Sequence, residues 1–158
     1  MTDRELYVER RNMELPKFER VMAALPKDKL AYKPHERSPT TLQILTTLVA
    51  EHDSCARLVA AGKTDFTPPP LKSVGEAVAA FEKNWDELDR QVAAMAPADW
   101  DKNGQFFSGG KMVSDQPIGG FLWFILFDAI HHRGQLSTYI RPMGGKVPAI
   151  YGPSADSR

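Results

Sequence analysis

Four long stretches of the sequence carry apolar side chains at helical spacing, and turn-forming residues separate them. Ser38-Pro39 precedes the second stretch and Gly62 follows it, a pattern typical of a helix cap, a first helical turn and a helix stop. Ser73 and Glu76 are spaced as a capping box at the start of the third stretch. The pattern predicts helices over residues 3–25, 40–61, 73–95 and 117–141.

Proline and glycine divide the rest of the chain. Pro16 predicts a kink or a break near residue 15 of the first helix, because proline has no amide hydrogen to donate. Residues 67–70, with three consecutive prolines, read as a stiff connector. Residues 96–116 form an irregular connection, in which 106–113 suit a hairpin or loop around two glycines. The tail after residue 143 is expected to be extended.

Four amphipathic helices in 158 residues favour one domain, residues 1–158, folded as an all-α four-helix bundle. No alternating pattern elsewhere predicts a strand. The second and third connections are long, so the helices need not follow a simple up-down-up-down order.

Charge excludes several classes of function. Twenty basic residues balance twenty acidic ones without a block of like charge, which argues against nucleic-acid partners and polybasic membrane anchors. The apolar run 121–127 is too short to cross a bilayer. A charged N-terminus without a signal pattern and a single cysteine, Cys55, predict a cytoplasmic protein without membrane partners.

Asp128 and His132 are the first candidates for chemistry. They lie four residues apart on the fourth helix, so both side chains project from the same face, close to an apolar stripe. A carboxylate and an imidazole fixed in this way suit a divalent metal. They also suit an aspartate that orients a histidine as a general base, or a buried histidine that is merely hydrogen-bonded.

The second helix offers two partners for that pair. His52 lies within the apolar stripe, where an unpaired polar group is costly, so it either completes a site or bonds to a threonine or a carbonyl. Glu51 lies at the edge of the stripe and is the alternative third ligand, or a solvated charge. Cys55, on the apolar side and without a neighbouring histidine, reads as a core thiol.

Residues 127–136, reading Phe-Asp-Ala-Ile-His-His-Arg-Gly-Gln-Leu, resemble the last-helix signature of the DinB-like (DNA-damage-inducible, YfiT-like) superfamily. The run His132-Arg133-Gly134-Gln135 is the specific part of this resemblance, which extends more weakly over the whole chain. The resemblance implies a four-helix bundle of up-down-down-up topology, often homodimeric. It also implies a divalent metal, usually zinc, nickel or iron, held by one histidine of the second helix and two of the last.

Family members include S-transferases that use bacillithiol or mycothiol, a maleylpyruvate isomerase and metal-dependent hydrolases without assigned substrates. The resemblance therefore implies a metal-dependent enzyme, transferase-like or hydrolase-like, that acts on a small molecule such as a low-molecular-weight thiol. The alternative is a non-catalytic, stress-related bundle that has a degenerate metal site and binds a small ligand.

The chain departs from the family pattern at two positions. Asp128 stands where the family has the first histidine of the last helix, while His132 matches the second. The histidine of the second helix falls near Thr47, and threonine is a poor metal ligand. Three outcomes are open: a site completed by His52, a site completed by Glu51, and a degenerate site.

Overall fold

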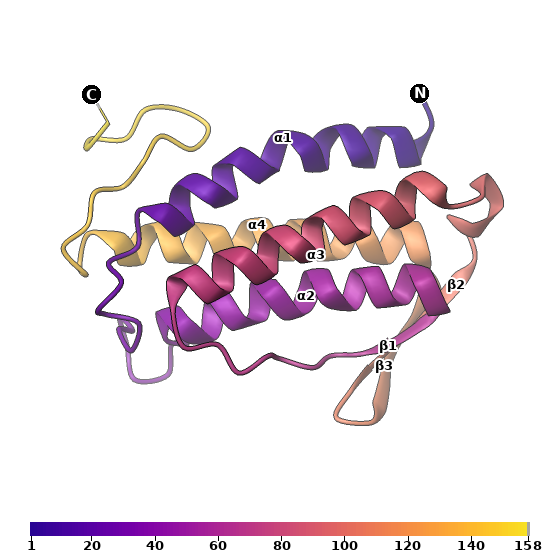
Figure 1. The fold of residues 1–158 in the computed structure, drawn as a ribbon, viewed down its shortest axis with the longest axis horizontal. Coiled ribbons are helices and arrows are strands. Elements are labelled where there is room, and N and C mark those ends of the chain that lie inside the picture. The colour runs from indigo at the N-terminus through magenta and orange to yellow at the C-terminus, as the bar shows by residue number, and fades with distance from the viewer. Residues whose placement is uncertain (158) are drawn as a thin grey trace.

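The computed structural model describes residues 1–157, and all four predicted helices are present within a few residues of their expected ends. They are α1 (Asp3–Ala23), α2 (Thr41–Ala61), α3 (Val74–Ala94) and α4 (Ile118–Ile140). Helices α1 and α4 run in one direction and α2 and α3 in the other, so the connection between α2 and α3 crosses the length of the bundle (Figure 1).

Local hydrogen bonds fix the helix starts. Thr40, not Ser38, caps α2: its hydroxyl accepts from the amide of Gln43, while the Gln43 side chain accepts from the amide of Thr40. Helix α1 continues through Pro16 instead of breaking there. Pro16 removes only the hydrogen bond to the carbonyl of Asn12, an exposed residue at which water can replace it.

The prediction of an all-α four-helix bundle holds only in part, because a three-stranded sheet joins the four helices. Its strands are β1 (Lys63–Asp65), β2 (Asn103–Ser108) and β3 (Lys111–Pro117), in the order β1-β2-β3. Strand β2 pairs in parallel with β1 and antiparallel with β3. A short 3₁₀ helix (Pro97–Asp99) precedes β2. Residues 96–116, which the sequence predicts to be irregular, therefore consist mostly of regular structure.

The hairpin formed by β2 and β3 is longer than the predicted one at residues 106–113, but its turn lies at the predicted pair of glycines. Gly109 and Gly110 have φ values of 58° and 76°, the left-handed conformation that a two-residue type I′ turn requires at both positions. Strand β1 is three residues long and its partner lies about 40 residues further along the chain. Such a non-local pairing leaves no local pattern to detect.

The sheet packs against one end of α2 and α4, beside the bundle (Figure 1). A Cβ atom at Gly104 of β2 would lie 2.8 Å from Cδ1 of Leu58, so only glycine lets the strand approach α2 this closely. On the α4 side, the rings of Phe106 and Phe121 pack with centroids 5.0 Å apart. The sheet is therefore held against both helices at this end of the bundle.

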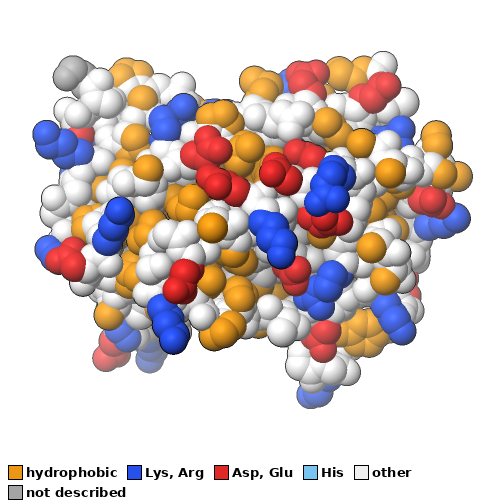
Figure 2. Space-filling view, viewed as in Figure 1, with side chains coloured by type: hydrophobic (Ala, Val, Ile, Leu, Met, Phe, Trp, Pro, Cys, Tyr) orange, Lys and Arg blue, Asp and Glu red, His pale blue; other side chains and the backbone are white. Residues whose placement is uncertain are grey.

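Two clusters of buried apolar side chains fill the space between the helices. The visible face of the molecule carries acidic and basic side chains in alternation, without an area of one sign (Figure 2). None of the described helices is long and apolar enough to cross a membrane.

The tight contact at Gly119 gives a stability prediction. A Cβ atom there would lie 2.2 Å from the ring of Trp100, and that ring is held by a hydrogen bond from Nε1 to Asp3. We expect Gly119→Ala to lower the free energy of unfolding by about 2–3 kcal/mol through overpacking. Urea denaturation measures it.

Gly120→Ala is the matched control, because no atom lies within 4 Å of a Cβ at the next position of the same helix. It should raise the free energy of unfolding by roughly 0.5–1 kcal/mol, through the lower entropy of the unfolded chain. Equal stabilities of the two variants would contradict the packing seen around Trp100.

Candidate functional site

The antiparallel pair α2 and α4 brings three of the predicted site residues together. Nε2 of His132 lies 3.5 Å from Oε1 of Glu51 and 3.9 Å from Oδ2 of Asp128. One ligand atom from each residue lies within 4.8 Å of the other two. The pair expected on the last helix thus meets Glu51, the alternative partner, and not His52.

The site is buried on one side and open on the other. The Glu51 side chain is 4% exposed, that of His132 19% and that of Asp128 39%. Glu51 therefore forms the floor, and Asp128 faces the solvent from which a small molecule would enter.

The carboxylate of Glu51 is in an unfavourable environment without a cation. Burial, and then the nearby carboxylate of Asp128, raise the pKa of Glu51 to about 9. Its Oε2 atom is buried and has no hydrogen-bond partner among residues 1–157. An unpartnered oxygen beside a second carboxylate is an arrangement that a bound cation would stabilise.

Gln135 orients the imidazole of His132. Nδ1 of His132 lies 2.8 Å from Oε1 of Gln135, and since this oxygen only accepts, Nδ1 must carry the hydrogen. Nε2, the other ring nitrogen, then faces the two carboxylates. A histidine whose second nitrogen is held in this way is the usual arrangement in metal sites.

The spacing of the three ligand atoms fits a metal ion. Two ligands at about 2.1 Å from a tetrahedral ion lie roughly 3.4 Å apart. The observed 3.5 Å and 3.9 Å are close to this separation and too long for direct hydrogen bonds from Nε2. Small side-chain movements would therefore let all three residues contact one ion.

His52 lies outside this group and is satisfied within the core. Its Nδ1 lies 2.9 Å from the carbonyl oxygen of Leu48, and its ring stacks on Trp85 with centroids 5.0 Å apart. Burial, and then the nearby Arg11, lower the pKa of His52 to about 3, so it stays neutral. This is the packing role that the sequence left open for it.

The remaining candidates also fall away from the site. The Thr47 hydroxyl donates back to the carbonyl of Gln43, at 3.0 Å, and leaves no free ligand one turn before Glu51. Cys55 is fully buried, and burial raises the pKa of its thiol, so it is not a nucleophile at neutral pH. His131 is exposed beside His132, and His35 is exposed in the loop before α2.

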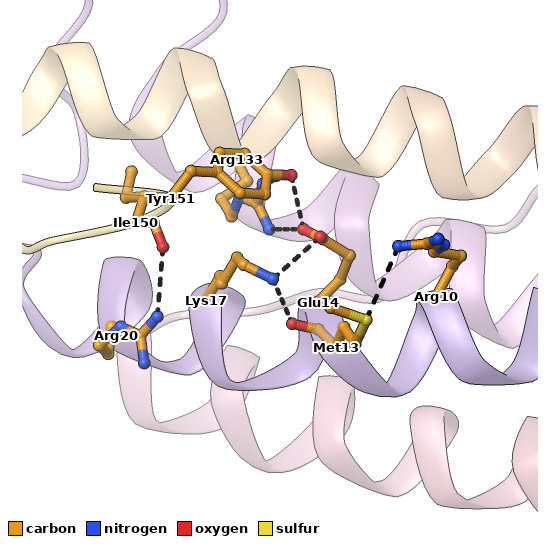
Figure 3. A network of polar contacts seen from close by, with 8 residues as sticks. All are labelled: Arg10, Met13, Glu14, Lys17, Arg20, Arg133, Ile150 and Tyr151. Carbon is orange, nitrogen blue, oxygen red and sulfur yellow. Dashed lines mark hydrogen bonds and ion pairs between the residues drawn. The ribbon is translucent and has the colours of Figure 1, made fainter.

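Arg133 has a role that the sequence did not reveal. Although it follows His132 directly, it points to the other side of α4 and is only 2% exposed. Its guanidinium donates hydrogen bonds to the carboxylate of Glu14 in α1 and, at 2.7 Å, to the hydroxyl of Tyr151 in the tail. Figure 3 shows these side chains together. The same Tyr151 hydroxyl donates to Glu14 at 2.8 Å, and Lys17 completes the network. We call these four residues the Arg133 clamp.

Comparisons with known proteins agree with this architecture. The family model described as the DinB superfamily matches residues 14–136. A segment of 40 residues is 42% identical to the uncharacterized protein YrdA of Bacillus subtilis (strain 168), and it spans 25% of this chain and 24% of that protein. The crystal structure of the DinB-like protein YjoA from Bacillus subtilis covers 90% of this chain and 91% of its own, with a TM-score of 0.63 at 19% identity. This likeness shows the fold alone.

The Arg133 clamp gives a pH-dependent prediction. Burial acts to raise the pKa of Glu14, but hydrogen bonds from Arg133, Tyr151 and Lys17 outweigh it and hold the pKa below 4.5. The stabilisation is therefore complete above pH 4.5 and is lost as the pH falls through the folded-state pKa. We expect Glu14→Gln to cost about 2–3 kcal/mol at pH 7, because Arg133 loses its carboxylate.

Urea denaturation at pH 7 and near pH 3 measures the effect, and the difference between wild type and variant should shrink in acid. Glu9→Gln is the control, since Glu9 is exposed on the same helix. A Glu14→Gln penalty that does not change with pH would show that the clamp is not ionic.

Proposed function

Since the chain belongs to the DinB superfamily, we propose that it is a metal-dependent enzyme that acts on a small molecule, with Glu51, Asp128 and His132 as ligands of one divalent ion. The observation that carries this proposal is the convergence of two carboxylates and an oriented imidazole from two helices. The buried, unpartnered Oε2 of Glu51 supports it independently.

The donor set indicates the kind of ion. Two carboxylates and one imidazole offer oxygen and nitrogen without sulfur, which suits zinc, nickel or iron. When bound, such an ion lowers the pKa of a coordinated water or thiol and makes it a nucleophile near neutral pH.

The residues of the chain supply position and access. Gln135 holds the imidazole of His132 in the tautomer that directs Nε2 to the site, and Glu51 forms the buried side of the site. Asp128, at the open edge, lies where an incoming molecule meets the site. The only cysteine is buried, so a reacting thiol has to come with the substrate.

Transfer of a low-molecular-weight thiol that arrives with the substrate is one form of the activity. Hydrolysis by water is the other, and both need the same three ligands. Under the non-catalytic alternative, these residues would bind no metal. Measuring the metal content of the protein therefore distinguishes the two proposals before any activity is known.

We expect one transition-metal ion per chain in protein that is purified without a histidine tag and incubated with zinc, nickel or iron. Elemental analysis gives the ratio. His132→Ala and Glu51→Gln should each abolish stoichiometric binding, because each removes one of three ligands. Glu51→Gln should leave the metal-free protein folded, because it replaces a buried unpaired carboxylate with a neutral amide of similar shape.

His131→Ala is the matched control and should keep the metal, since His131 is an exposed neighbour on the same helix. Gln135→Leu should weaken the affinity by about 10- to 100-fold while leaving the stoichiometry unchanged, as expected for a residue that orients a ligand. Absence of bound metal in the wild-type protein after all three incubations would overturn the proposed function.

We also propose that the protein forms a homodimer through the outer face of α4. Phe124 and Phe127 are more than half exposed there, and Phe127 borders an apolar groove of about 360 Å³ between α1 and α4. A protruding ring beside a groove on the same surface is self-complementary, as a two-fold interface requires.

Sedimentation velocity tests this interface. Phe127→Asp should convert a dimer to monomers, because it introduces two charges at the two-fold contact, while the hairpin variant Met112→Asp should not. Met112 is similarly exposed, so it serves as a matched control. A wild-type protein that sediments as a monomer at high micromolar concentration would refute the dimer and leave the metal proposal intact.

A further inference from the structure

An open pocket of about 750 Å³ lies along the first half of α2 and extends as far as Thr47. The loop before α2, the first two turns of α2 and the proline connector line it. The connector runs back along the bundle from β1 to the start of α3 (Figure 1), so consecutive prolines form one wall. Proline fixes the backbone, and a wall of this kind is rigid before any ligand arrives.

The pocket leads toward Glu51. Thr47 belongs to its lining and lies one helical turn before Glu51, about 6 Å along the axis. The hydroxyl of Thr47 is turned back onto Gln43, so the side chain presents its methyl group and does not compete for polar atoms of a ligand. A molecule seated in the pocket therefore has to extend only about one helical turn past Thr47 to reach the level of Glu51.

The charges of the lining select a monoanion. Lys33 and Arg37 bring two positive charges and Glu36 one negative charge, a net charge of +1. Lys33 already donates to the carbonyl oxygen of Glu36, at 2.8 Å. Arg37 forms no ion pair with any described residue, so its guanidinium is free to bind a carboxylate with two parallel hydrogen bonds.

The rest of the lining suits an apolar chain. Leu42, Pro69 and Leu71 contribute hydrocarbon surface to the lining of the pocket. The volume lies in the range of small-molecule sites, which pair apolar walls with a few polar anchors.

We infer that this pocket recognises the substrate of the proposed enzyme, and that the substrate is a small monocarboxylate with an apolar body. Arg37 binds its carboxylate, and its other end lies past Thr47 at Glu51, Asp128 and His132. The inference rests on the proposed function for the identity of the reacting end, while the pocket itself needs no metal.

Hexanoate is a suitable probe, with neutral hexanamide of the same length beside it. In ¹H–¹⁵N spectra of the metal-free full chain, hexanoate should shift the amides of Arg37, Thr46 and Thr47, and hexanamide should bind more weakly. Arg37→Gln should reduce the affinity for hexanoate by about five- to tenfold and leave that for hexanamide unchanged.

Arg10→Gln is the matched control, because it removes the same charge from an exposed position on α1 and should not alter binding. The pocket assignment is overturned if hexanoate shifts no amides there, or if wild type and Arg37→Gln bind it equally.

Manganese then tests whether the pocket serves the metal site. With Mn²⁺ bound, the methyl end of hexanoate should relax faster than the end next to the carboxylate, and His132→Ala should abolish the effect. Failure of Mn²⁺ to bind, together with failure of zinc, nickel and iron, counts against the proposed function and leaves the pocket result standing. If Mn²⁺ binds but enhances the relaxation of bound hexanoate equally at both ends, or at neither end, the proposal that the pocket binds the substrate is wrong.

Discussion

The antiparallel contact between α2 and α4 determines where the three candidate metal ligands and the small sheet lie. Because the two helices run in opposite directions, Glu51 faces the helical turn that contains Asp128 and His132. The same contact supports the sheet at one end, where Gly104 reaches Leu58 and Phe106 reaches Phe121. A shift of one turn between the two helices would move Glu51 by about 5.4 Å relative to Asp128 and His132, which stay together on α4.

The helix register also divides neighbouring residues of the His-Arg-Gly-Gln run between different tasks. Successive side chains point about 100° apart, so His132 faces α2 while Arg133 faces α1. Gln135, three residues after His132, returns to the side of the site and accepts the hydrogen of its Nδ1. One short run therefore joins the candidate metal site to the Arg133 clamp, and the clamp fixes α1 and the tail to α4 (Figure 3).

Glu51 and His52 show how burial of two adjacent polar groups leads to opposite results. His52 is surrounded by Phe81 and Trp85, has a carbonyl partner and stays neutral, so its burial costs little. Glu51 keeps an unpartnered oxygen next to Asp128, an arrangement that is costly unless a cation or a proton neutralises it. The cost of burying Glu51 therefore lies at the position where a bound cation would remove it.

The sequence by itself determined the four helices, the stiff proline connector, the glycine turn at residues 109–110 and the shared face of Asp128 and His132. All of these follow from interactions between residues close in the sequence, such as helix caps, the restricted φ angles of proline, the free φ angles of glycine and the 3.6-residue repeat of the helix. Only the tertiary structure decided the pairing of β1 with β2, the position of Glu51 rather than His52 beside Asp128 and His132, and the contacts of Arg133 with Glu14 and Tyr151. Each of those joins segments far apart in the chain, and their relative register depends on how whole helices pack.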